Sequence, residues 1–241
     1  TLGHAVTQYA LEIALGTKLT KITSLGNDIA LALAAPTGTI RIEAPIPGRS
    51  LVGTEVPNHS PEFVSLKQLL TSDQMQSNKS QLAIGLGLDV AGKPALGDLD
   101  RMPHLLIAGA TGSGKSVMIN AIIATYLFRT TPNEVKFILV DPKVVELTGF
   151  NGIPNLLTPV ITEPEKTLSA LKWAIAEMER RYQLFASAGA KNITQYNESS
   201  GFQALPYIVI IIDELADLMM FAPAEIEDAI VRLAQKSRAT W

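Results

Sequence analysis

Apolar and polar positions follow two different patterns along the chain, and the change between them divides the sequence. In the first 80 residues the apolar positions alternate over short stretches, as where Ile40 and Ile42 alternate with Arg41 and Glu43. A period of two predicts a half-buried strand over residues 39–44. The same region predicts extended segments over 5–13 and 51–56, a short helix over 28–35, and a helix that starts at Pro61 and runs to about Met75. These elements predict a small α+β domain over residues 1–80.

From residue 81 onward, continuous apolar runs alternate with helical stripes. The runs predict buried strands at residues 105–109, 135–140 and 207–212. Helices are predicted over 116–128 and 225–235, and a long helix follows Thr162, which has Glu165 three residues later as in a capping box. The long helix carries an apolar stripe of Leu168, Leu171, Ile175, Met178, Tyr182 and Phe185. Strands alternating with helices predict an α/β fold over 81–241, with a parallel sheet covered on both faces.

Composition narrows the class of protein. Of the 241 residues, 47% are apolar and 18% are charged, which is typical of a folded chain with an ample core. No apolar run approaches the roughly 20 residues of a membrane-spanning helix, and we expect no signal peptide in residues 1–10. The absence of cysteine excludes disulfides, thiolate zinc sites and cysteine nucleophiles. His4, His59 and His104 lack metal-ligand spacing, and we interpret them as structural.

One glycine-rich segment carries the strongest chemical signal. It fits the pattern G-x-x-x-x-G-K-[ST] with Gly109, Ala110, Thr111, Gly112, Ser113, Gly114, Lys115 and Ser116. Glycines let successive main-chain N–H groups point at phosphate oxygens, and the N-terminus of the following helix adds further donors and a positive potential. Lys115 would reach the β- and γ-phosphates, and the Ser116 hydroxyl would bind Mg²⁺. The alternative is a glycine-rich structural turn.

A second signal follows the apolar run at residues 207–212, which leads directly into Asp213 and Glu214. This arrangement fits the Walker B position, with Asp213 at the Mg²⁺ ion and Glu214 orienting the attacking water. Alone the pattern is weak, because many buried strands end in aspartate. The pattern lies about a hundred residues after the glycine-rich segment 109–116, which has the form of a phosphate-binding P-loop, and this order strengthens the Walker B interpretation.

Two weaker candidates accompany these motifs. Lys143 follows Asp141 and Pro142 at the end of the run over 135–140, where ligands lie in open α/β sheets. It could contact a γ-phosphate in its own or a neighbouring subunit, although a solvated loop explains it equally well. Arg238 is a possible arginine finger, but an arginine after a helix more often only favours the helix dipole.

Together these segments resemble the motor of the FtsK/SpoIIIE family of DNA translocases. The resemblance rests on residues 102–117, on Asp141-Pro142-Lys143 with Val145-Glu146-Leu147, on Trp173 with residues 177–179 and 181–182, on Asn192-Ile193 with Tyr196-Asn197, and on residues 212–219. Upstream, residues 40–48 and 55–58 resemble the family's small α domain. The likeness covers nearly the whole chain.

The resemblance implies a RecA-like β domain joined to an α domain, with six copies forming a ring around duplex DNA. ATP hydrolysis at the subunit interfaces would drive the DNA through the ring and segregate chromosomes at bacterial cell division. It also implies a cytoplasmic motor whose parent protein is anchored at the inner membrane of the septum. The family's membrane helices and winged-helix domain lie outside this sequence. The family pattern also continues after Thr240 with a strand, and the resemblance implies that this strand supplies a γ-phosphate sensor and the arginine that acts across the interface.

Two alternatives remain open. The first is a related ring ATPase of a secretion or conjugation system, whose cargo is protein or single-stranded DNA. The second is a nucleotide-binding fragment without turnover, because the sequence ends at Trp241. The formal net charge of −3 gives no attraction of the whole molecule to DNA, so DNA contact would need a local patch or an assembled surface.

Overall fold

The computed structural model describes residues 3–14, 16–60, 62–200 and 204–237. Contacts within the chain divide it into two units. The first comprises Thr1–Ser77 and Gly85–Leu96, and the second comprises Asn78–Ile84 and Gly97–Trp241. This division places residues 85–96 with the first unit, whereas the sequence assigns them to the second domain.

The first unit is built around a three-stranded antiparallel sheet. Its strands β1 (Val6–Leu11), β2 (Arg41–Glu43) and β3 (Val52–Pro57) lie in the order β1-β3-β2. The register pairs Val6 with Pro57 and Leu11 with Val52. Two short helices, α1 (Leu19–Thr23) and α2 (Gly26–Ala32), lie between β1 and β2 in the sequence. The predicted strands and the predicted helix over 28–35 are therefore confirmed with small shifts, and α1 was not predicted.

The helix predicted from Pro61 to Met75 is wrong. Pro61 lies outside the described residues, and the segment instead forms two short helices, α3 (Leu66–Leu70) and α4 (Asp73–Gln76). The Ser65 hydroxyl accepts a hydrogen bond from the Gln68 N–H, and the Ser72 hydroxyl accepts one from the Met75 N–H. Each serine caps a helix start by satisfying an N–H group that lacks an intrahelical partner.

A β-hairpin follows that the sequence analysis did not predict. Its strands β4 (Ala83–Leu88) and β5 (Pro94–Asp98) pair with each other. The Asp89 carboxylate accepts hydrogen bonds from the N–H groups of Ala91 and Lys93, which closes the turn between them. The turn is held by a side chain that bonds its own backbone, as aspartate often does.

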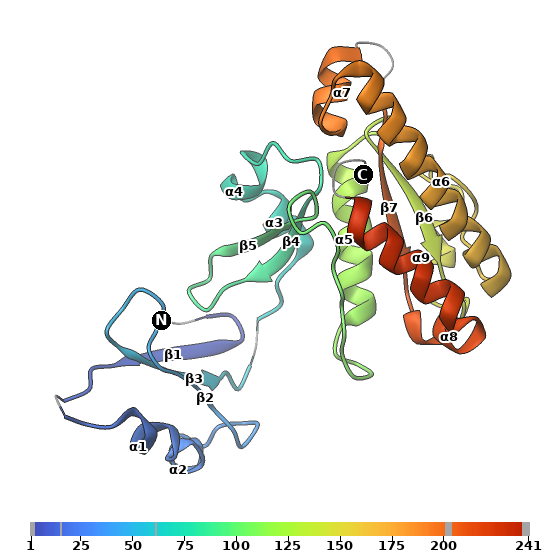
Figure 1. Ribbon diagram of the computed structural model, residues 1–241. Helices are drawn as coiled ribbons and strands as arrows, with labels where there is room; N and C mark the ends of the chain where they lie inside the picture. Colours follow the sequence, from blue (N-terminus) through green and yellow to red (C-terminus); the bar gives the residue numbers. More distant parts are fainter. Residues whose placement is uncertain (1–2, 15, 61, 201–203, 238–241) are drawn as a thin grey trace. The chain divides into compact units, whose positions relative to one another are not determined.

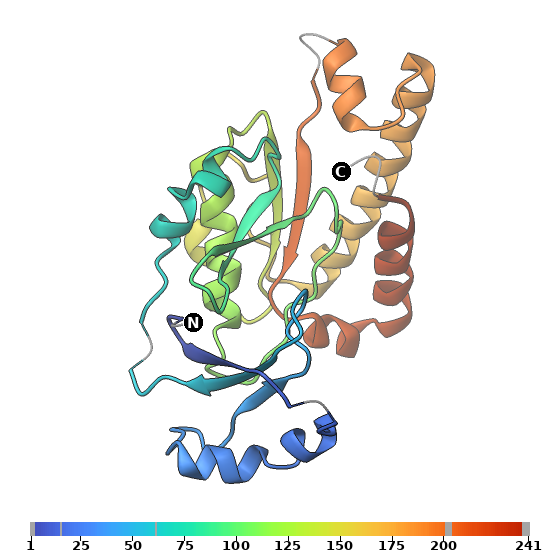
Figure 2. The same cartoon turned by 90° about the vertical axis from the view of Figure 1, so that its left-hand side faces the viewer.

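The second unit has a parallel strand pair at its centre, covered by helices on both faces. Strands β6 (Val135–Val140) and β7 (Tyr207–Ile212) lie side by side in Figures 1 and 2. Helix α5 (Lys115–Arg129) lies on one face, and α6 (Pro164–Ala188) and α9 (Pro223–Lys236) lie on the other. The remaining elements are η1 (Thr148–Phe150), α7 (Ile193–Ser200) and α8 (Leu215–Phe221). This arrangement confirms the predicted α/β class.

Strand β6 has neighbours on both edges. On one edge it pairs with β7, and on the other its Phe137 N–H donates to the Asn155 carbonyl at 2.8 Å. Its side chains alternate between two apolar clusters. Phe137 and Leu139 pack with α5, whereas Ile138 and Val140 pack with α6 and α9. A strand buried on both faces needs apolar residues at every position, which explains the continuous run.

The prediction of a buried strand over residues 105–109 is wrong. This segment is extended but forms no strand, and Leu105 and Leu106 are 41% and 81% exposed. No strand among the described residues pairs with the second edge of β7. Apolar composition predicts burial, but a strand is buried only when a neighbour pairs with its edge and other side chains cover its faces.

Helix α6 begins one residue later than the capping-box pattern predicts. Glu163 occupies the N-cap and Pro164 the first turn, so Thr162 is not the cap. Proline favours this position because its missing N–H would be unpaired there in any case. The predicted stripe is largely confirmed, but Tyr182 is 37% exposed and its hydroxyl donates to the Lys236 carbonyl. No helix in the described part of the chain is long and apolar enough to cross a membrane.

A buried arginine of α6 joins this helix to the start of β7. The Arg181 side chain is 2% exposed, and its Nε donates to Glu177 at 2.8 Å. Its terminal nitrogen also donates to the carbonyl of Pro206, immediately before β7, at 2.9 Å. Burial lowers the pKa of Arg181, and the Glu177 carboxylate opposes that shift. The ion pair therefore fixes the entry of β7 against α6.

We expect Glu177→Ala to lower the free energy of unfolding by about 3–5 kcal/mol, because it leaves the Arg181 guanidinium buried without its counter-ion. Equilibrium unfolding in urea measures this change. The matched control is Glu179→Ala, whose exposed carboxylate pairs with Arg232 and whose loss should cost no more than about 1 kcal/mol. Equal effects in the two variants would contradict a special role for the buried pair.

Candidate active site

The glycine-rich loop forms a tight turn that leads into α5. Gly114 is the N-cap of that helix with φ of 99°, and Gly112 has φ of 80°. Residues with a side chain rarely adopt a positive φ of this size, so both positions favour glycine. A Cβ at Gly109 would collide with the Ser113 side chain, which shows how closely the loop curls. The predicted P-loop therefore has the required order of curled loop and helix N-terminus.

The acidic pair lies where β7 ends. Asp213 follows the last residue of β7, and its N–H donates to the Val140 carbonyl at 3.0 Å. Its side chain is 4% exposed, whereas that of Glu214 is 34% exposed. Glu214 is the N-cap residue of α8, with no hydrogen bond from its side chain to the helix N-terminus.

Lys115 joins the glycine-rich loop to the acidic pair. Its Nζ donates to the main-chain carbonyl of Asp213 at 2.7 Å and to the Asp213 carboxylate at 3.1 Å. It also lies 3.4 Å from the Glu214 carboxylate. Partial burial lowers the pKa of Lys115, but the hydrogen bonds and negative charges of Asp213 and Glu214 outweigh it and raise the pKa above its usual value. Lys115 is therefore held as an ammonium ion.

Asp141 organises the loop that carries Lys143. Its buried carboxylate accepts hydrogen bonds from the N–H groups of Val145, Glu146 and Leu147 at 3.3, 3.0 and 2.8 Å. Burial raises the pKa of Asp141, but these main-chain hydrogen bonds outweigh it and lower the pKa below its usual value. The carboxylate therefore stays ionised and fixes the loop in one conformation.

Lys143 points from that loop toward the acidic residues. Its Nζ lies 3.7 Å from the Glu214 carboxylate and 3.5 Å from that of Asp217. The structure thus brings Lys115, Lys143, Asp213 and Glu214 together. Asp217 was not predicted as a site residue, although its spacing three residues after Glu214 at a helix start could have indicated it. Arg238 lies outside the described residues.

The Ser116 side chain occupies the first turn of α5 and is partly buried. In the described part of the chain, no group of three or more His, Asp and Glu side chains could hold a metal ion by itself. Mg²⁺ is usually bound by one or two carboxylates together with waters and substrate phosphates. Asp213 and Ser116 offer the oxygen atoms for such a shared ion, so the residues present fit Mg²⁺.

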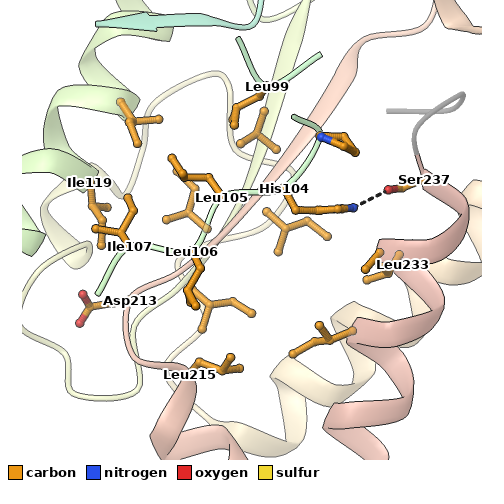
Figure 3. Close-up of a pocket in the computed structure, with 18 of the residues that line it drawn as sticks. Leu99, His104, Leu105, Leu106, Ile107, Ile119, Asp213, Leu215, Leu233 and Ser237 are labelled. Atoms are coloured by element: carbon orange, nitrogen blue, oxygen red, sulfur yellow. Dashed lines mark hydrogen bonds between the residues drawn. The ribbon is translucent and has the colours of Figure 1, made fainter. Parts of the chain in front are cut away.

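A cavity of about 640 Å³ adjoins the site, between the extended segment over residues 103–109 and β7. Figure 3 shows Leu105 and Ile107 of this segment between Ile119 on α5 and Leu233 on α9, with Asp213 at one end. The His104 ring and the Ser237 hydroxyl form a hydrogen bond of 3.0 Å beside it. Most of the lining is apolar, so the charged groups are confined to the end nearest Lys115.

Comparisons with known proteins show the family to which the chain belongs. The sequence profile of the FtsK/SpoIIIE family matches residues 65–205 and 199–240, and that of the FtsK alpha domain matches residues 1–58. The chain therefore belongs to the FtsK/SpoIIIE family.

Among its relatives, the DNA translocase FtsK of Caldanaerobacter subterraneus subsp. tengcongensis is 55% identical over 239 residues, which cover 99% of this chain and 33% of the relative. The DNA translocase SpoIIIE of Bacillus subtilis is 52% identical over 247 residues, covering 99% of this chain and 31% of the relative. The chain thus spans about a third of the length of these relatives.

A solved structure shares the fold. The pCW3 conjugation coupling protein TcpA, determined in a monomer form with ATPγS, has a TM-score of 0.60 and 24% sequence identity. The match covers 93% of this chain and 62% of that one. At this identity the likeness concerns the fold.

We expect Asp141→Asn to lower the free energy of unfolding at pH 7 by roughly 1–3 kcal/mol, because an amide offers one acceptor oxygen and would turn N–H donors toward the loop's N–H groups. The stabilisation by the native carboxylate is present above its unfolded pKa of about 3.9 and is lost as the pH falls through the lower folded value. Unfolding measured from pH 7 to pH 3 should therefore show a weaker acid dependence in the variant. Asp228→Asn, at an exposed position, is the control; an acid dependence equal to that of the native chain in Asp141→Asn would contradict this assignment.

Proposed function

We propose that this chain is the ATP-hydrolysing motor segment of a duplex-DNA translocase. The observation that supports the proposal is the contact of Lys115 with Asp213 and Glu214, because it joins the glycine-rich loop to two carboxylates at the end of a parallel strand. That is the arrangement required to bind a nucleoside triphosphate and to activate water beside it.

The loop residues Gly109 to Ser116 would bind the phosphates. Main-chain N–H groups at the start of α5 would donate to phosphate oxygens, where the helix dipole also favours negative charge. Lys115 would exchange its contacts with the carboxylates for contacts with the β- and γ-phosphates. Lys143, which lies beside Glu214, would be a second cation near the γ-phosphate.

Glu214 would act on the attacking water. Its carboxylate is more exposed than that of Asp213, so it can accept a hydrogen bond from a water molecule. Asp213 and Ser116 would provide ligands for Mg²⁺. When bound, Mg²⁺ would neutralise the charge on the β- and γ-phosphates. Glu214 would orient the water for attack on the γ-phosphorus and accept its proton.

The proposed DNA substrate follows the relatives that share more than half of their aligned residues with this chain and are named DNA translocases. We infer that residues 1–80 are the α domain and 81–241 the ATPase domain, and that six copies surround duplex DNA. The net charge of −3 means that DNA contact would depend on a surface formed in the ring. The longer protein would act in chromosome segregation, at the cytoplasmic face of the bacterial inner membrane near the division septum.

The alternative of a conjugation or secretion ATPase is less well supported. The fold is shared with TcpA, but the sequence identity to it is less than half of that to the translocases. The match of the FtsK alpha domain to residues 1–58 also favours the translocase.

We expect the chain to hydrolyse ATP, with a rate that rises when long linear duplex DNA is added. Lys115→Ala should lower the DNA-stimulated rate at least about 100-fold, because it removes the ammonium group that faces the phosphates. A coupled ATPase assay measures the rate, and Lys172→Ala, at an exposed position of α6, is the matched control. Undiminished hydrolysis in Lys115→Ala would overturn the assigned phosphate site, and stimulation by protein cargo or single-stranded DNA alone would favour the alternative.

We expect Glu214→Gln to bind ATP as tightly as the native chain but to hydrolyse it about 10²- to 10⁴-fold more slowly, because the amide cannot accept the proton of the attacking water. Binding of a fluorescent ATP analogue and single-turnover hydrolysis separate the two effects. Normal turnover in this variant would assign the base to another residue.

A further inference from the structure

Asp217 shares a lysine with the proposed catalytic glutamate. Glu214 occupies the N-cap position of α8 and Asp217 lies in the first turn of that helix, so the two carboxylates are three residues apart at the same helix end. Lys143 lies between them, with its Nζ 3.7 Å from Glu214 and 3.5 Å from Asp217. Lys143 belongs to the loop that Asp141 fixes, so these contacts join the ends of β6 and β7.

A single oxygen of Glu214 faces two ammonium groups. Its Oε2 is 3.4 Å from Lys115 and 3.7 Å from Lys143. In the described part of the chain these two lysines are the ion-pair partners of Glu214. Lys115 also has the Asp213 carbonyl and carboxylate as acceptors, whereas the ion-pair partners of Lys143 are Glu214 and Asp217.

The two lysines should respond differently when a nucleotide binds. An ammonium group has three N–H donors, and in Lys115 these are directed to the Asp213 carbonyl, the Asp213 carboxylate and Glu214. Donation to phosphate oxygens therefore requires Lys115 to give up part of this set. Lys143 would then be the cation that remains beside Glu214.

We propose that Asp217 is a positioning residue of the ATPase site, which holds Lys143 beside Glu214 so that the glutamate keeps its orientation after Lys115 turns to the phosphates. This inference rests on the proposed function. The role concerns orientation rather than stability, since the Lys143 side chain is 54% exposed and that of Asp217 is 32% exposed. Ion pairs at such exposure contribute little to folding, but a small displacement of a catalytic group can slow the chemical step about 100-fold.

The test compares Asp217→Asn, Lys143→Ala and the double variant in the full chain with duplex DNA present. We expect Asp217→Asn to lower kcat about tenfold while the dissociation constant of a non-hydrolysable ATP analogue changes less than about twofold. The double variant should be no slower than Lys143→Ala, because Asp217 acts through that lysine. Asp217→Glu, which keeps a carboxylate on the same helix turn, should recover much of the lost rate. Asp228→Asn, on the exposed side of α9, should match the native chain.

The outcomes separate this inference from the function on which it rests. If the native chain hydrolyses ATP and Glu214→Gln does not, but Asp217→Asn has native kcat, the positioning role is overturned and the proposed function stands. A further loss of rate when Asp217→Asn is added to Lys143→Ala would also overturn it, because Asp217 would then act independently of the lysine. Weaker analogue binding in step with the slower rate would instead assign Asp217 to nucleotide binding. If the native chain does not hydrolyse ATP, both proposals fail.

Discussion

The parallel pairing of β6 with β7 is the constraint on which the candidate site depends. The two strands pair residue for residue, from Val135 with Tyr207 to Val140 with Ile212. Asp141 and Asp213 therefore follow the strands at the same end of the sheet, although they are 72 positions apart in the sequence. A slip of one residue would turn every side chain of β7 to the opposite face. The two apolar clusters oppose such a slip, because each takes alternate residues of both strands.

At this end of the sheet the lysines of the site form ion pairs with its carboxylates. Asp213 is almost fully buried, and a buried carboxylate needs a cation or several hydrogen-bond donors beside it. Lys115 satisfies that need in the structure. In the proposed nucleotide-bound state Lys115 would also bind the phosphates. Mg²⁺, for which Asp213 is the proposed ligand, would then supply positive charge beside the Asp213 carboxylate. Asp141 needs no such cation, because three main-chain N–H groups stabilise its carboxylate.

The extended segment before the glycine-rich loop departs most from what its sequence predicts. Residues 105–109 are as apolar as β6 and β7, yet they form no ladder with the second edge of β7, and a cavity lies between the two. The capping box at Thr162 failed for a different reason, because Pro164 fits the first turn and makes Glu163 the N-cap residue. For residues 105–109 the tertiary structure decided between structures that the apolar pattern left open, whereas at α6 a neighbouring proline in the sequence did.

The sequence by itself determined the α/β class and the strands over 135–140 and 207–212, and it singled out Lys115, Lys143, Asp213 and Glu214 as candidate site residues. These features follow from local rules: continuous apolar runs, helical spacing, and glycines where the main chain must curl. Only the tertiary structure decided that Lys115 contacts both Asp213 and Glu214, that Asp141 fixes its loop, and that Lys143 is shared with Asp217. These contacts join residues from separate elements, and their distances depend on strand register and helix packing, which no local pattern specifies.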